Sequence, residues 1–269
     1  NRNKTTVQMC KTYLSSHGFN LGIKEPKDLP NTLKTCCYMC INNNSNYAKP
    51  QEVDAGPYND AIITAREFQH AGHPVYYIEN PTRMRYFQFL RTILSKTTDT
   101  VYIYITGSCH DVKDDTFLVF ADDEVPGAQF SSFLKCFKLK TSRVFLLFDL
   151  SHVKIKEDVP RILQIDLVPN TIFACNDFIE NTYYDNSTTI PCGGYLTYVL
   201  WKEIDRNPKA TFNEMEQSIN SVICKFGYKL FLATSNREIL DHQIVLPGPI
   251  ERINIVPTNS SQQPSEAAN

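Results

Sequence analysis

The stretch Val144-Phe-Leu-Leu-Phe-Asp-Leu-Ser-His152 decides the fold. Its unbroken apolar run is typical of a strand that is buried on both faces, as in a parallel sheet covered by helices. The run ends in Asp149, and Ser151 and His152 follow almost at once. The carboxyl ends of such strands are where α/β proteins bind ligands. The stretch therefore predicts a buried strand with a candidate site at its end.

A second apolar run, Val101-Tyr-Ile-Tyr-Ile-Thr106, ends in the same manner, in Gly107-Ser108-Cys109-His110. The carboxyl ends of parallel strands meet at one edge of a sheet. We therefore expect Ser108 and Ser151 to lie close together, on loops that follow the two strands.

Short apolar runs alternate with helical patterns in the rest of the chain, which is the signature of a mostly parallel sheet with helices on both faces. Further strands are expected at 35–41, 74–79, 171–175, 228–233 and 243–246, with a small ribbon around 116–120. Helices are expected at 58–71, 83–96, 128–137, 192–205 and from Thr211, which opens a capping box with Glu214. The pattern predicts a single three-layer α/β domain at 35–250. Residues 1–34 are expected to form an N-terminal extension, and residues 251–269 a disordered tail.

The composition limits the compartment and the partners. A hydrophobic fraction of 42% supports a real core, and a net charge of −2 gives no electrostatic case for nucleic acid or an anionic membrane. We expect no membrane span, because no apolar run is long enough, and no signal peptide, because no basic-then-apolar pattern opens the sequence. Most of the nine cysteines lie in apolar runs, which predicts reduced core thiols in a cytoplasmic protein. Cys37 and Cys40 face opposite sides of their strand, which argues against a zinc or redox pair.

The arrangement resembles the caspase and metacaspase family of clan-CD cysteine peptidases over about residues 35–250. That family carries a His-Gly pair after its third strand and Asp-x-Cys after its fourth. The remaining similar segments are Tyr58-Asn59-Asp60-Ala61, Ala71-Gly72-His73-Pro74-Val75, Ala174-Cys175-Asn176-Asp177, Gly193-Gly194-Tyr195-Leu196-Thr197-Tyr198 and Asp241-His242-Gln243-Ile244-Val245-Leu246. The resemblance implies a three-layer sandwich with a mostly parallel six-stranded, caspase-like sheet.

The departures from the family fall on its chemistry. Ser108 stands at the position of the family's catalytic His, Cys109 at the Gly after it, and Ser151 at the nucleophilic Cys. A thiol ionises near neutral pH and is strongly nucleophilic, whereas a Ser hydroxyl needs a well-placed base. The resemblance therefore implies a peptidase scaffold whose catalytic pair has been lost.

Three side chains keep other hypotheses open. His110 and His152 are surrogate bases, which would have to turn toward Ser151 or toward the Cys109 thiol; otherwise they are exposed loop residues. Asp149 matches a residue that lines the acidic pocket for Arg or Lys in metacaspases. The alternative for Asp149 is a strand-end carboxylate that caps backbone N–H groups.

An acidic cluster follows the second apolar run. Its members are Asp111, Asp114, Asp115, Asp122, Asp123 and Glu124. Many metacaspases use Ca²⁺ near this place, and oxygen ligands would suit that ion, but the spacing fits no EF-hand loop. We expect a solvated acidic hairpin, no metal site and no cofactor, with Ca²⁺ as the alternative.

These observations favour a catalytically inactive caspase- or metacaspase-like protein that acts as a binding, regulatory or structural component. Its expected partner is a protein, either an active relative or a larger assembly, and not nucleic acid or membrane. The alternative is an active cysteine- or serine-type endopeptidase that cleaves after a basic residue with displaced catalytic groups.

Overall fold

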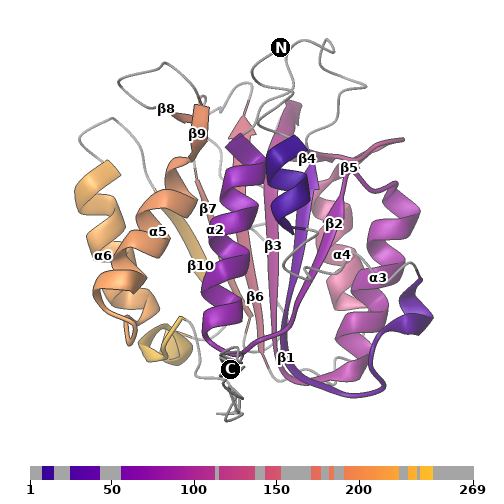
Figure 1. The fold of residues 1–269 in the computed structure, drawn as a ribbon, viewed down its shortest axis with the longest axis horizontal. Coiled ribbons are helices and arrows are strands. Elements are labelled where there is room, and N and C mark those ends of the chain that lie inside the picture. The colour runs from indigo at the N-terminus through magenta and orange to yellow at the C-terminus, as the bar shows by residue number, and fades with distance from the viewer. Residues whose placement is uncertain are drawn as a thin grey trace, which may run out of the picture.

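The computed structural model describes residues 8–14, 25–42, 56–112, 115–136, 143–152, 171–176, 182–184, 191–223, 230–234 and 237–244. These ranges form an α/β fold (Figure 1). The strands are β1 (Leu33–Asn42), β2 (Val75–Glu79), β3 (Thr97–Val112), β4 (Asp115–Val119), β5 (Glu124–Pro126), β6 (Arg143–His152), β7 (Thr171–Asn176), β8 (Thr182–Tyr184), β9 (Pro191–Gly194) and β10 (Leu230–Thr234). The α-helices are α2 (Gly56–His70), α3 (Arg83–Lys96), α4 (Gly127–Lys135), α5 (Tyr195–Arg206) and α6 (Phe212–Ile223). Residues 8–14 are also helical, and two 3-10 helices are η1 (Pro26–Asp28) and η4 (Arg237–Asp241).

The main sheet has the strand order β10-β7-β6-β3-β1-β2. Adjacent strands in the row β7-β6-β3-β1-β2 are parallel to each other, and β10 is antiparallel to β7. The expectation of a mostly parallel sheet is thus confirmed. The sheet has eight strands rather than the six expected, because β3 continues beyond Thr106 and its extension pairs with β4, which in turn pairs with β5. Strands β8 and β9 form a separate two-stranded sheet.

Side-chain alternation along the strands creates two hydrophobic clusters, one on each face of the sheet. In β1, Cys37 and Met39 belong to the cluster under α2, α5 and α6, whereas Cys36 and Cys40 belong to the cluster under α3 and α4. Figure 1 shows these two groups of helices on opposite sides of the sheet. The three-layer prediction is confirmed, and so is the prediction that Cys37 and Cys40 face opposite sides.

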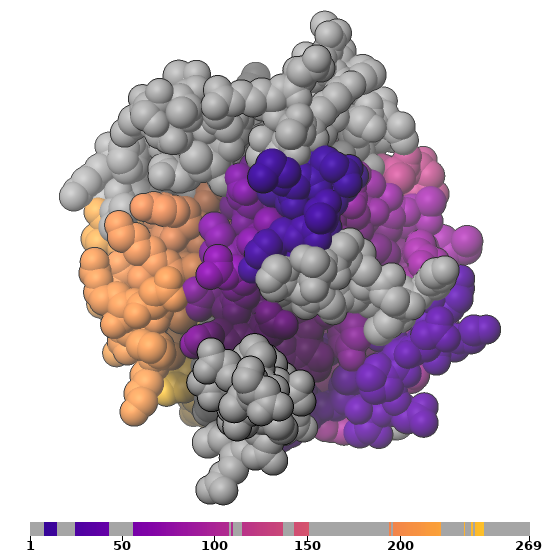
Figure 2. Space-filling model, viewed as in Figure 1, coloured from indigo at the N-terminus to yellow at the C-terminus, as the bar shows by residue number. Residues whose placement is uncertain are grey.

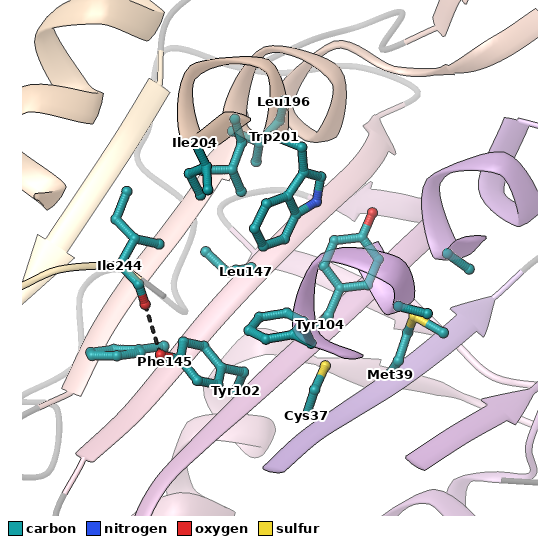
Figure 3. Packing of buried hydrophobic residues seen from close by; sticks show 14 of the residues in the cluster. Cys37, Met39, Tyr102, Tyr104, Phe145, Leu147, Leu196, Trp201, Ile204 and Ile244 are labelled. Carbon is teal, nitrogen blue, oxygen red and sulfur yellow. Dashed lines mark hydrogen bonds between the residues drawn. The ribbon is translucent and has the colours of Figure 1, made fainter. Parts of the chain in front are cut away.

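Trp201 is a buried member of the first cluster, and its indole N–H donates to Thr64 at 2.9 Å. Figure 3 shows side chains of β1, β3 and β6 packed beneath α5, with the Tyr102 hydroxyl bonded to the carbonyl of Ile244 at 2.7 Å. This contact ties the segment after η4 to the middle of the sheet. The first cluster also packs α5 against β3 and β6, and in this way it positions the candidate site described below.

Several helix ends follow the local signals in the sequence. Thr82 caps α3 by accepting from the amide of Arg85, and Thr211 and Glu214 form the predicted reciprocal capping box before α6. Gly72 follows α2 with a φ of 83°, which favours a residue without Cβ.

Other expectations need correction. The helix expected from Cys192 begins at Tyr195, because Pro191–Gly194 pair with β8. Of the strand expected at 243–246, Gln243 forms only an isolated bridge to Thr211, and residues 245–246 lie outside the described ranges. Cys136 is exposed at the end of α4 instead of buried.

The N-terminal extension contributes to the core. Cys10 and Leu14, in the helix at residues 8–14, are buried in the first cluster, so this part of residues 1–34 packs on the domain. Residues 251–269 lie outside the described ranges. None of the helices in those ranges combines the length and hydropathy that a bilayer crossing requires.

Candidate functional site

The two serine positions are direct neighbours in the sheet. Strands β3 and β6 are parallel, and their register pairs Ser108 with Ser151 and Cys109 with His152. Adjacent strands lie about 4.8 Å apart, so the backbones of Ser108 and Ser151 are as close as two strands allow. The structure thus brings together the two positions that the sequence singled out.

The backbone at these positions is strand, not loop. Ser108 and His110 lie in β3, where His110 pairs with Phe117 of the antiparallel β4. Ser151 and His152 are the last two residues of β6. The expectation of loop tips is therefore wrong, because both strands run on past the apolar cores that predicted their ends. The side chains of these four residues lie outside the described part of the structure.

Cys109 does not lie open to solvent. Its side chain is 1% exposed and belongs to the second cluster, together with Leu118 and Leu150. A thiol that packs against apolar side chains on the α3–α4 face is not accessible to a peptide bond. The hypothesis of Cys109 as a displaced nucleophile therefore has no support in this geometry.

Asp149 is hydrogen-bonded to the first turn of α5. Its carboxylate is 1% exposed, and one oxygen accepts from both the amide (2.9 Å) and the hydroxyl (2.6 Å) of Thr197. A carboxylate at a helix N-terminus is stabilised by the free N–H groups and by the helix dipole. Asp149 thus acts as a cap supplied by a neighbouring strand. Its role in binding a basic side chain stays a prediction.

A second buried carboxylate holds the same helix end. Asp60 of α2 is 3% exposed and accepts from the amide of Gly194 at 2.9 Å with each of its oxygens. It also accepts from the Thr106 hydroxyl at 3.1 Å. Gly194 is the N-cap residue of α5 and has no side chain to do this. Two carboxylates from β6 and α2 therefore converge on the first turn of α5.

Gly194 is required by this close approach. A Cβ built at this position would lie 2.1 Å from Oδ2 of Asp149 and 2.4 Å from its Cγ, far inside van der Waals contact. Only a residue without a side chain lets α5 begin so near the carboxylate. The pair Gly193-Gly194 before a helical pattern was the sequence signal for this contact.

Tyr104 completes the buried network. Its hydroxyl is 2.5 Å from the Thr197 hydroxyl, which itself donates to Asp149, so Tyr104 donates to Thr197. Burial, and then the charges of Asp60 and Asp149, raise the pKa of Tyr104 well above its ordinary value. The phenol keeps its proton, and the chain of hydrogen bonds runs from β3 through α5 to β6.

Sequence reasoning missed Asp60, Thr197 and Tyr104 as a unit. Asp60 and Thr197 lie inside segments that resemble the family, and Asp60 neighbours Ala61, which faces the core. A buried carboxylate on an apolar helix face indicates a polar partner across the helix, but the sequence does not say which partner that is.

The acidic cluster has structural contacts in the described ranges. Asp122 accepts from the amide of Arg83 at 2.8 Å, and Asp123 accepts from its guanidinium at 2.9 Å, which lowers the pKa of Asp123. Asp111 and Asp114 lie outside what can be described for side chains. Where side chains are described, no group of three or more His, Cys, Asp or Glu is placed to hold a metal. The expectation of no metal site, with Ca²⁺ as its alternative, stays a prediction.

Chemically, the described residues offer carboxylates, hydroxyls and a phenol that are engaged with one another at the start of α5. They hold a helix in place and stabilise negative charge by N–H and O–H donors.

No protein-family model matches the chain, and no curated protein matches it. The resemblance to caspases and metacaspases rests on the sequence motifs.

Proposed function

We propose that this chain is a caspase-like protein without peptidase activity, which acts by binding another protein. The observation that carries the proposal is the pairing of Ser108 with Ser151 at the ends of adjacent parallel strands. In the family that the chain resembles, these positions carry the catalytic His and Cys. Two serines supply neither an imidazole base nor a thiolate.

The size of the expected loss supports an inactive site. In a serine peptidase, removing one member of the catalytic unit lowers turnover by on the order of a millionfold, and removing the others adds little. With both members replaced, we therefore expect peptidase turnover too low to be of use.

The position of Asp149 supports the same proposal. In the metacaspases that the chain resembles, a residue at this position helps to bind Arg or Lys, but here its carboxylate is buried and bonded to Thr197. The carboxylate is therefore not exposed to a basic side chain. The alternative of a displaced active site is further weakened by the burial of Cys109.

The proposed partner is an active relative or a larger assembly. The six cysteines whose side chains are described are free thiols, five of them buried, which supports a reducing compartment such as the cytoplasm. Retention of the fold without its chemistry is the pattern expected of a regulatory or scaffolding subunit.

The test is a comparison of the wild-type chain with Ser151→Ala. Both are incubated with fluorogenic peptides that carry Arg or Lys before the scissile bond, and with a thiol- and hydroxyl-reactive peptide probe. We expect no labelling at Ser151 or Cys109, and equal background turnover in both. An active metacaspase, prepared in the same way, shows that the substrates and probe work. Labelling at Ser151 or Cys109, or turnover that disappears in the variant, would overturn the proposal.

A further inference from the structure

A groove separates two helices on the first face of the sheet. It has a volume of about 1010 Å³ and is lined by α2 and α5, with Tyr13 from the helix at residues 8–14. Figure 2 shows α2 and α5 side by side on the near face of the molecule. The groove lies outside the Asp60–Asp149 network, so the candidate site does not use it.

The walls of the groove are partly apolar. Tyr13 and Ile63 are partly buried against the first cluster, and Trp201 lines the groove from the core side. Tyr198 is 36% exposed and is one of the few large apolar side chains in the described ranges that reach solvent. Tyr and Trp side chains that are only partly covered are enriched in protein–protein interfaces.

Two carboxyl groups meet across the groove. Glu67 of α2 and Asp205 of α5 both line the groove. Partial burial, and then the nearby Asp205 carboxyl, raise the pKa of Glu67 to about 7. Once the proton leaves, two like charges remain close together, and a cation placed between them would remove their repulsion.

Two positively charged side chains, Arg66 and Lys202, also line the groove. Arg66 acts on Glu67 in the opposite sense, but its effect is the smallest of those on that carboxyl. The Lys202 ammonium lies 5.6 Å from the centre of the Tyr198 ring, in a cation–π contact. His70 also lines the groove from α2.

We propose that the groove between α2 and α5 docks a protein segment that places a Lys or Arg side chain between Glu67 and Asp205. The apolar neighbours of that basic residue would pack against Tyr13, Ile63 and Tyr198. The inference rests on the proposed function in one respect, that the chain acts by binding a protein, and it adds the chemistry of the partner. A metal ion fits less well, because the described part of the chain brings no third carboxylate, His or Cys to the pair.

The test uses three labelled pentapeptides, acetyl-Ala-Leu-X-Leu-Ala-amide with X as Arg, Gln or Glu, and fluorescence anisotropy. At about pH 8, above the pKa of Glu67, the Arg peptide should bind at least about fivefold more tightly than the Gln peptide. At about pH 6 Glu67 holds its proton and this preference should fall by several fold. The Glu peptide should bind most weakly at the higher pH.

Matched variants assign the effect to the pair. Glu67→Gln should weaken the Arg preference by about fivefold and remove its pH dependence. Glu216→Gln, on α6 and outside the groove, should change neither. His70→Gln is the control for the imidazole that also lines the groove, and it should leave the pH dependence in place. Circular dichroism confirms that each variant is folded.

Each remaining outcome counts against the inference. Binding that is undetectable up to about 1 mM peptide, or equal for the Arg and Gln peptides, would overturn it. So would a preference that survives in Glu67→Gln, or a pH dependence that disappears in His70→Gln. Probe labelling of Ser151 would overturn the proposed function and leave the groove result unaffected, so the two failures are distinguishable.

Discussion

Replacement of Gly194 by Ala tests the carboxylate-held start of α5 directly. The new Cβ would lie 2.1 Å from Oδ2 of Asp149, whereas ordinary contacts begin at 3.4 Å, so the carboxylate must move by more than an ångström. Such a shift breaks its two hydrogen bonds to Thr197, which are 2.9 and 2.6 Å long. Hydrogen bonds to a charged group contribute about 1.5–3 kcal/mol each. We therefore expect Gly194→Ala to lower the free energy of unfolding by about 3–5 kcal/mol.

The assay is urea denaturation followed by circular dichroism, arranged as a double-mutant cycle. Gly194→Ala should lose most of its effect in an Asp149→Ala background, because the obstructing group is absent there. Thr197→Val keeps the amide bond to Asp149 but removes the hydroxyl bond and the acceptor of the Tyr104 hydroxyl, and it should lower stability by at least about 2 kcal/mol. If Gly194→Ala alone does not fold, the double variant still reports whether it is tolerated once Asp149 is gone. A loss below about 1 kcal/mol for Gly194→Ala, or an equal loss in both backgrounds, would refute the reasoning.

Three further predictions concern the rest of the molecule. Because the pKa of Glu67 is raised from 4.5 to about 7, the folded state keeps a proton that the unfolded chain releases in this range, so stability falls as pH rises through it. Glu67→Gln should remove this component, about 1 kcal/mol after allowance for solvent screening, as seen in urea midpoints at about pH 5 and about pH 8. Cys136 is exposed whereas burial raises the pKa of the Cys37 thiol, so peptide mapping after brief alkylation should find Cys136 modified and Cys37 not. Trp201→Phe removes the 2.9 Å bond to Thr64 and should lower stability by about 1–2 kcal/mol in thermal or urea unfolding; no change would contradict that contact.

The repeating features of the fold could be predicted from the sequence because they depend on periodicity and on local chemistry. The 83–96 helix was predicted with the bounds that the structure gives it, since Thr82 caps it and its apolar residues recur at helical spacing. The alternation that separates Cys37 from Cys40 is likewise a local property of a strand.

Strand ends were less predictable, because pairing rather than hydrophobicity decides them. The residues after Thr106 are polar, and nothing local indicates that they continue β3; they do so because β4 and β6 offer hydrogen-bond partners on both flanks. For the same reason the sequence predicted loops at Ser108 and Ser151, although it predicted correctly that the two positions meet.

The contacts of the candidate site depend on distances between segments far apart in the chain. The sequence offered two roles for Asp149, a basic-residue pocket or a backbone cap. The 2.9 Å bond from the Thr197 amide to its carboxylate shows that it caps α5. The groove between α2 and α5 was not foreseen at all. Glu67 and Asp205 read as ordinary exposed-face charges in two separate helices until the helices are packed together.

The central place of β3 has a consequence for how this chain acquires its structure. Thr100 pairs with Thr35 on one flank and with Arg143 on the other, so each ladder joins residues many positions apart. Closing loops of that length costs entropy before the hydrogen bonds of either ladder can form, and proteins of high contact order therefore fold slowly. Until both ladders form, newly made chains expose long apolar strands to one another, and we expect their yield on refolding to depend steeply on concentration and on chaperones.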